Sequence, residues 1–121
     1  ANPDSMKASL VTLNTIKKKR SIAVLGDMLE LGDYSNTAHY EVGKIAVDVK
    51  TDIVITFGEL SLLTKKGAEE NGAKAYSFMD KKELTEFLKS ILQENDTVLF
   101  KGSRSMKMEE IFHELYKEWE V

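Results

Sequence analysis

Cationic and hydroxyl side chains gather in one short segment, Lys101-Gly102-Ser103-Arg104-Ser105. An apolar run too short for a helix precedes it and predicts a buried strand, and a three- and four-residue apolar spacing after it predicts a helix. Cations beside the first N–H groups of a helix suit a carboxylate or phosphate. We expect one serine to cap the helix and the other to face the ligand. The segment therefore predicts an anion-binding site, with Arg104 as its principal contact and Lys101 beside it.

These residues also have structural interpretations. Arg104 could be an ordinary surface arginine, and a strand-end lysine such as Lys101 commonly extends its ammonium group to solvent. Met106 and Met108 fit the apolar core better than a ligand contact. Sequence alone leaves both interpretations of Lys101 and Arg104 open.

A second segment that could do chemistry is the long connection 26–37 after an apolar strand. Asp27 is either a turn former, an acceptor for a ligand ammonium group or a partner for Arg104. Glu30 fits solvent better than catalysis. His39 is expected in the first turn of a helix capped at residue 36 or 37, with a surface position as the default and a ligand-facing role as the alternative. The connection exceeds the two to six residues usual for such loops, and its apolar residues predict that it packs against the protein.

Strands and helices alternate along the whole chain. This pattern predicts a doubly wound α/β fold, Rossmann-like, with about four mainly parallel strands and helices on both faces. Right-handed crossovers give the strand order 3-2-1-4, which makes the first and last strands neighbours at the point where the winding reverses and ligands bind. The expected strands are 21–25, 52–57, 73–78 and 98–100.

Composition excludes several classes of protein. The net charge of −3 gives no reason to expect nucleic acid or a membrane surface as partner, and no apolar run reaches membrane-spanning length. Neither a phosphate loop nor a dinucleotide-binding glycine motif is present. The sequence contains no cysteine and only two histidines, far apart, so we assign no metal ligand and expect a cytoplasmic protein.

The first residues have the pattern of a helix start. Asn2 is the expected N-cap, Pro3 the first helical residue and Asp4 its first-turn acid. We expect a single α/β domain over 1–121 that was cut from a longer chain at a hinge, although removal of an initiator methionine would look the same. The basic run 17–20 is expected to be solvated.

Three stretches together resemble the C-terminal domain of the Mur ligases. They are Ala1-Asn2-Pro3-Asp4-Ser5-Met6, then Val24-Leu25-Gly26-Asp27-Met28-Leu29-Glu30-Leu31-Gly32 with His39 following, and finally Lys101-Gly102-Ser103-Arg104-Ser105-Met106-Lys107-Met108-Glu109. The resemblance spans nearly the whole chain and is strongest to the branch that adds D-alanyl-D-alanine to UDP-N-acetylmuramoyl-tripeptide in peptidoglycan synthesis.

The resemblance implies a three-domain, ATP-dependent ligase. ATP with Mg²⁺ converts the peptide carboxylate to an acyl phosphate, which the incoming amine attacks. ATP and Mg²⁺ are bound mainly by a central domain that this chain lacks. The C-terminal domain presents D-alanyl-D-alanine and closes over ATP, and it is expected to be inactive and without cofactor in isolation.

The resemblance also implies site residues. The segment Lys101-Gly102-Ser103-Arg104-Ser105 faces the incoming dipeptide, and Asn2, in the hinge segment 1–5, approaches the nucleotide. Asp27 and His39 are implied as catalytic residues that line the same pocket and orient the amine or accept its proton. The aspartate and tyrosine–asparagine pair that precede this hinge position in the family do not occur here.

Other classes remain as alternatives. A non-enzymatic α/β module that binds a small anion or a protein partner would share the same fold. A phosphorylation-receiver domain fits less well, because the third strand is followed by Asp80, which is expected to cap a helix.

Overall fold

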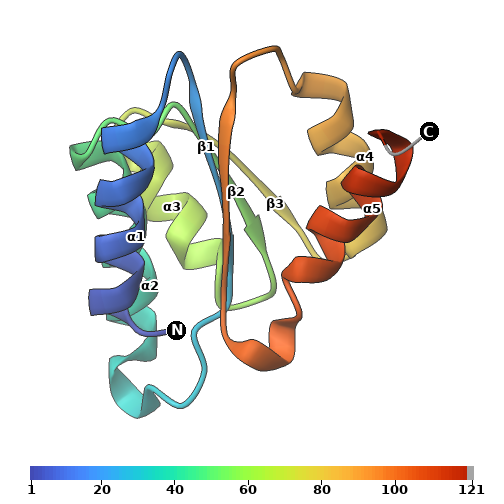
Figure 1. The fold of residues 1–121 in the computed structure, drawn as a ribbon. Coiled ribbons are helices and arrows are strands. Elements are labelled where there is room, and N and C mark those ends of the chain that lie inside the picture. The colour runs from blue at the N-terminus through green and yellow to red at the C-terminus, as the bar shows by residue number, and fades with distance from the viewer. Residues whose placement is uncertain (120–121) are drawn as a thin grey trace.

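The computed structural model describes the backbone of residues 1–119 and the side chains of residues 1–117. Its centre is a four-stranded sheet with the order β3-β2-β1-β4, in which every pair of neighbours is parallel. This confirms the predicted order and topology (Figure 1). The strands are β1 Ser21–Gly26, β2 Ile53–Phe57, β3 Lys74–Phe78 and β4 Thr97–Lys101.

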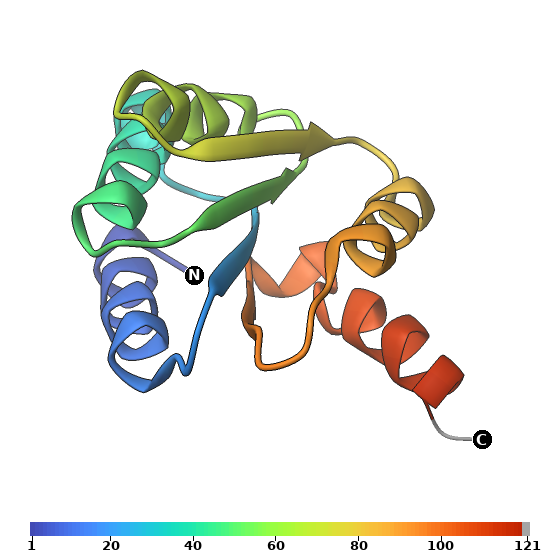
Figure 2. The same ribbon diagram turned by 90° about the horizontal axis from the view of Figure 1, so that it is seen from above.

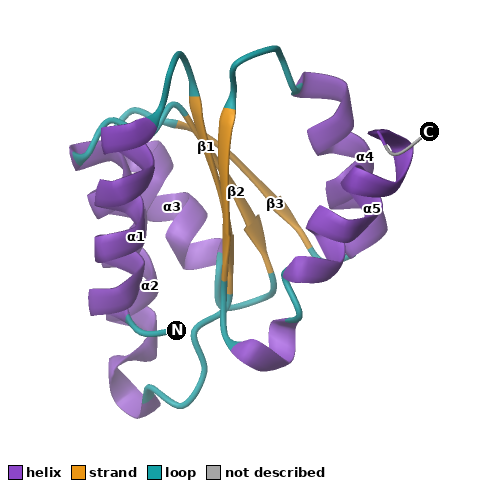
Figure 3. Cartoon of the chain, viewed as in Figure 1, coloured by secondary structure: helices purple, strands orange, loops and turns teal. Residues whose placement is uncertain are grey.

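Helices cover both faces of the sheet, as predicted. One face carries α1, α2 and α3, and the other carries α4 and α5 (Figures 1 and 2). Two 3₁₀ turns, η1 and η2, interrupt the connections that follow β1 and β4 (Figure 3). Within the described part of the chain, every helix is too short or too polar to cross a membrane. The helical elements are α1 Pro3–Ile16, η1 Gly32–Tyr34, α2 Ser35–Asp48, α3 Leu62–Glu70, α4 Lys81–Ile91, η2 Arg104–Met106 and α5 Glu109–Trp119.

Alternating side chains of the strands build two separate cores. In β1, Ala23 and Leu25 face the helices α1 to α3, whereas Ile22 and Val24 face α4 and α5. Each fully buried Leu or Ile side chain stabilises the fold by about 1.5–3 kcal/mol. The two cores fix the sheet between its helix layers.

The strand β4 is less buried than its apolar sequence suggests. All five of its residues are half-buried, because β4 lies at the edge of the sheet and pairs with β1 alone. The expectation of a fully buried last strand is therefore wrong. The edge position expected for β3 is confirmed.

Helix starts agree with the sequence at two sites and differ at a third. Asn2 caps α1, since its Oδ1 accepts a hydrogen bond from the N–H of Ser5 at 2.9 Å, and Asp80 caps α4. By contrast, α2 begins at Ser35 without a side-chain cap. The predicted cap at residue 36 or 37 is wrong because η1 leads directly into the helix and supplies its first turn.

The last helix packs by part of its predicted apolar face. Met108, Ile111 and Leu115 are buried, whereas Phe112 and Tyr116 are exposed. The side chain of Trp119, which the spacing assigns to the same face, lies outside the described side chains.

Candidate functional site

The two segments singled out in the sequence meet at the carboxyl edge of the sheet, which is the lower edge in Figure 1. β1 and β4 are direct neighbours, with Leu25 paired to Lys101. Just beyond this pair the backbones approach closely, because a β-carbon added to Gly102 would lie 3.0 Å from the Cα atom of Gly26. The strand order therefore brings both connections together, as predicted.

Ser103 joins the two connections. It is buried, its N–H donates to the carbonyl oxygen of Asp27 at 2.9 Å, and its Oγ accepts from the N–H of Leu29 at 2.8 Å. Ser105 is exposed within η2. Neither serine caps α5, which begins only at Glu109, so the predicted capping role is wrong.

The N-terminus of α5 also differs from the expected anion site. Two acidic residues, Glu109 and Glu110, occupy its first turn and already complement the positive end of the helix dipole. Lys81 pairs with Glu110 at 2.6 Å and lowers the pKa of that carboxyl through a hydrogen bond and its charge. Any anion at this edge must therefore be bound by the cations of the loop and not by the helix terminus.

Asp27 is directed toward α3 and not toward Arg104. Its carboxylate is 7% exposed, and Oδ1 accepts hydrogen bonds from the N–H of Ser61 at 2.8 Å and from its hydroxyl at 2.6 Å. The N–H of Leu60 donates to Oδ2 at 3.4 Å. The carboxylate thereby satisfies backbone donors where α3 begins.

His39 is fully buried, so the surface position expected for it is wrong. Its Nε2 lies 3.0 Å from the N–H of Met28, and its Nδ1 lies 2.7 Å from the carbonyl oxygen of Ser35. Since an amide N–H can only donate, Nε2 is the acceptor and Nδ1 carries the proton, which makes the imidazole neutral. The ring therefore supports the backbone of the β1–α2 connection from within.

Two cations at this edge are available for a ligand. Arg104 is exposed and Lys101 is half-buried, and neither forms an ion pair within the described side chains. They border a hollow of about 480 Å³ whose other walls include Phe100 and Phe112 and, at the start of α5, the acidic Glu109. Cations beside an apolar wall fit a small carboxylate that carries a short apolar side chain. Glu30 is exposed in the adjacent connection.

Sequence reasoning missed the contribution of the β2–α3 connection. Ser61 is fully buried against Asp27. Gly58 has a φ of +109°, and a β-carbon there would lie 2.5 Å from both carboxylate oxygens of Asp27. The available signal was that β2 ends at the same edge and is followed by a glycine and a serine just before a helix.

The N-terminal end of the chain lies toward the lower edge of the sheet in Figure 1, and Asn2 directly precedes α1. It is exposed, and its side chain is engaged in the capping box with Ser5. Among the described side chains, those of residues 1–117, no three acidic or histidine side chains are grouped so that they could hold a metal ion.

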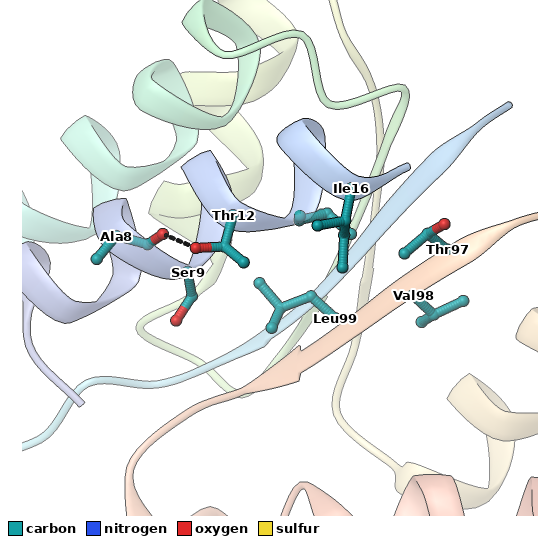
Figure 4. A pocket seen from close by; sticks show the side chains of 8 residues that line it. Ala8, Ser9, Thr12, Ile16, Thr97, Val98 and Leu99 are labelled. Atoms are coloured by element: carbon teal, nitrogen blue, oxygen red, sulfur yellow. Dashed lines mark hydrogen bonds between the residues drawn. The ribbon is translucent and has the colours of Figure 1, made fainter. Parts of the chain in front are cut away.

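A second hollow, of about 290 Å³, lies between α1 and the first half of β4, away from the carboxyl edge of the sheet (Figure 4). Its walls carry apolar and hydroxyl side chains without an ionisable group, so it does not suit an anion. The lining residues are Ala8, Ser9, Thr12, Leu13, Ile16, Thr97, Val98 and Leu99.

The known proteins described next have similar sequences and share one name. A UDP-N-acetylmuramoyl-tripeptide–D-alanyl-D-alanine ligase of Bacillus subtilis is 38% identical over 118 residues, which cover 95% of this chain and 26% of that protein. The ligase of the same name from Escherichia coli is 37% identical over 119 residues, which cover 95% of this chain and 25% of that protein. The chain thus spans about a quarter of the length of these relatives.

Solved structures show the same fold. MurF from Acinetobacter baumannii superposes with a TM-score of 0.87 at 30% identity, over 97% of this chain and 26% of that one. MurF ligase from Thermotoga maritima in complex with ADP gives a TM-score of 0.76 at 28% identity, over 98% of this chain and 26% of that one. The family model described as "Mur ligase, glutamate ligase domain" matches residues 1–104. The chain therefore belongs to the Mur ligase family, which confirms the resemblance found in its sequence.

Proposed function

We propose that this chain is the C-terminal domain of a three-domain ligase that joins D-alanyl-D-alanine to UDP-N-acetylmuramoyl-tripeptide, and that it presents the dipeptide. The observation that carries the proposal is the exposed Arg104 beside the half-buried Lys101, on a loop fixed by the buried Ser103. The names of the relatives support this choice of substrate.

The dipeptide offers a carboxylate at one end and an amine at the other. Arg104 can bind the carboxylate through two parallel hydrogen bonds, and Lys101 adds a second positive charge. Gly102 allows the backbone to approach β1 closely, and Ser105 provides an exposed hydroxyl beside the ligand. Holding the dipeptide by its carboxylate directs its amine toward the peptide carboxyl group to be joined, and such positioning is a major part of the rate gain in a two-substrate reaction.

In this proposal, Asp27 and His39 position the β1–α2 connection relative to the loop that carries Arg104. The carboxylate of Asp27 and both ring nitrogens of His39 are engaged by donors and acceptors of the protein itself. Their hydrogen bonds keep the β1–α2 connection beside the loop that carries Arg104.

The residues of this chain do not fit ATP or Mg²⁺. The sequence lacks a phosphate loop, and the side chains that the structure describes, of residues 1–117, form no acidic cluster for a metal. We propose that both are bound by the remaining domains. That the MurF ligase from Thermotoga maritima was solved in complex with ADP supports the use of an adenine nucleotide. Residues 1–5 would then form the hinge, with Asn2 near the nucleotide.

Arg104→Ala in the full-length ligase tests the proposal. The KM for D-alanyl-D-alanine should rise about 10- to 100-fold, the equivalent of losing charge-assisted hydrogen bonds, while the KM for ATP stays the same. Lys74→Ala, which removes an exposed cation in β3, should change neither constant. An unchanged KM for the dipeptide in the Arg104 variant would contradict the proposal that Arg104 binds the dipeptide at this edge.

A further inference from the structure

A buried chain of hydrogen bonds crosses the ends of β2, β1 and β4. It starts at Ser61, whose N–H and hydroxyl both donate to Oδ1 of Asp27, at 2.8 and 2.6 Å. Ser61 is fully buried, so water does not compete for either bond. Two donors from one residue fix this carboxylate oxygen more closely than one donor would.

Asp27 extends the chain to β4 through its backbone. Its carbonyl oxygen accepts the N–H of Ser103 at 2.9 Å, and the Oγ of Ser103 accepts the N–H of Leu29 at 2.8 Å. Arg104 is the next residue after Ser103. The position of its Cα atom therefore depends on the position of Asp27.

The surrounding backbone leaves little room for another arrangement. Only a residue without a β-carbon fits at Gly58, where the carboxylate oxygens of Asp27 would lie 2.5 Å away. At the other end of the chain, a β-carbon on Gly102 would lie 3.0 Å from the Cα atom of Gly26. The three connections are therefore packed as one unit.

We infer that Ser61 is a positioning residue for the dipeptide, an inference that rests on the proposed function. Its hydroxyl holds Asp27, Asp27 holds Ser103, and Ser103 determines where Arg104 presents its guanidinium group. Ser61 itself contacts neither the ligand nor the reacting atoms.

The kinetic test is Ser61→Ala in the full-length ligase. The KM for D-alanyl-D-alanine should rise about tenfold, as expected for losing one hydrogen bond to a charged group, while kcat and the KM for ATP remain within about twofold. A purely structural defect would instead reduce the fraction of active enzyme and hence kcat. Ser21→Ala is the matched control, because Ser21 is equally buried and also donates a 2.6 Å bond, to Asn14 at the opposite edge.

A double-mutant cycle tests whether Ser61 acts through Asp27. Asp27→Asn should also raise the KM for the dipeptide, and adding Ser61→Ala to it should cause no further rise. Asp27→Asn alone still tests the relay if Ser61→Ala does not fold. Additive effects of the two substitutions, or an unchanged KM in Ser61→Ala, would overturn the inference.

An NMR measurement on the 121-residue chain separates this inference from the proposed function. Ser61→Ala should shift the amide resonances of Leu29 and Ser103, whereas Ser21→Ala should leave both in place. Unchanged resonances in Ser61→Ala would overturn the relay even if the ligase accepts the dipeptide. If the unmodified full-length enzyme does not accept the dipeptide, the proposed function fails, and these shifts still decide whether the relay exists.

Discussion

One residue pair far from the candidate site, Arg20 with Asp96, joins the start of β1 to the start of β4. The guanidinium Nε and Nη2 donate to the two carboxylate oxygens at 3.0 and 2.7 Å, and Nη2 also donates to the carbonyl oxygen of Ile91 at 2.8 Å. Burial by itself would raise the pKa of Asp96, whose side chain is 3% exposed. The hydrogen bonds from Arg20 and from the N–H of Gln93 outweigh burial and lower this pKa below its usual value.

Arg20→Gln should therefore lower the free energy of unfolding by about 2 to 4 kcal/mol near neutral pH, because it leaves a buried carboxylate without its partner. A carboxyl group with a lowered folded-state pKa contributes its full stability above the unfolded pKa of about 3.9, and this contribution is lost as pH falls through the folded-state value. The difference between the variant and the unmodified chain should thus shrink as pH falls below about 3.9. Urea unfolding at several pH values measures it.

Lys117→Gln is the control for this prediction. It breaks an exposed pair in α5, in which Lys117 and Glu114 are 3.4 Å apart and more than half exposed, so it should have little effect at any pH. A pH-independent loss in Arg20→Gln would show that Asp96 does not depend on the pair. The sequence did not reveal Arg20 in this role, because the basic run 17–20 was expected to be solvated and its acidic partner lies 76 residues away.

At the scale of elements, α2 and α3 pack backbone to backbone. A β-carbon added to Gly43 would overlap the carbonyl oxygen of Thr64, and one added to Gly67 would overlap that of Tyr40. Interiors are packed too densely to absorb such an overlap without moving a helix. These two glycines allow α3 to pack close to α2, in the position in which Ser61, directly before α3, binds Asp27.

Gly43→Ala should lower the free energy of unfolding by about 3 kcal/mol or more, because it forces the two helices apart. Thermal or urea unfolding of the 121-residue chain measures the loss. Lys44→Ala, an exposed position on the same helix, should leave the stability nearly unchanged. Equal stability in the Gly43 variant and the unmodified chain would contradict the close packing.

The elements themselves could be predicted from periodicity, and the first residues of several helices could not. Short apolar runs that end at a glycine locate strands. The capping residues Asn2 and Asp80 locate the starts of α1 and α4. The starts of α2 and α5 follow 3₁₀ turns instead of the predicted capping residues, so local sequence placed the start of α2 too late and the start of α5 too early. In the site, Arg104 and Ser103 stand out by residue type, whereas the link from Ser61 to Asp27 spans 34 residues and depends on the tertiary fold.

At the scale of the whole molecule, the sheet separates two edges with different roles. The amino edge contains the Arg20–Asp96 pair, which joins the start of β1 to the start of β4, and the Ser21–Asn14 bond, which joins β1 to α1. The carboxyl edge contains the connections that carry Arg104 and Lys101. Because parallel strands all end at this edge, residues from three connections can act together there, and a ligand bound there faces away from the stabilising contacts of the other edge.

Amide hydrogen exchange on the full-length ligase would show where the dipeptide binds. The enzyme would be held with UDP-N-acetylmuramoyl-tripeptide and a non-hydrolysable ATP analogue, and exchange compared with and without D-alanyl-D-alanine, with L-alanyl-L-alanine as the control dipeptide. We expect the D,D-dipeptide alone to slow amide exchange at residues 27–31 and 101–106, and to leave exchange unchanged at the amino edge around residues 49–52. Protection by the D,D-dipeptide that leaves residues 101–106 unchanged would contradict the claim that this edge presents the dipeptide.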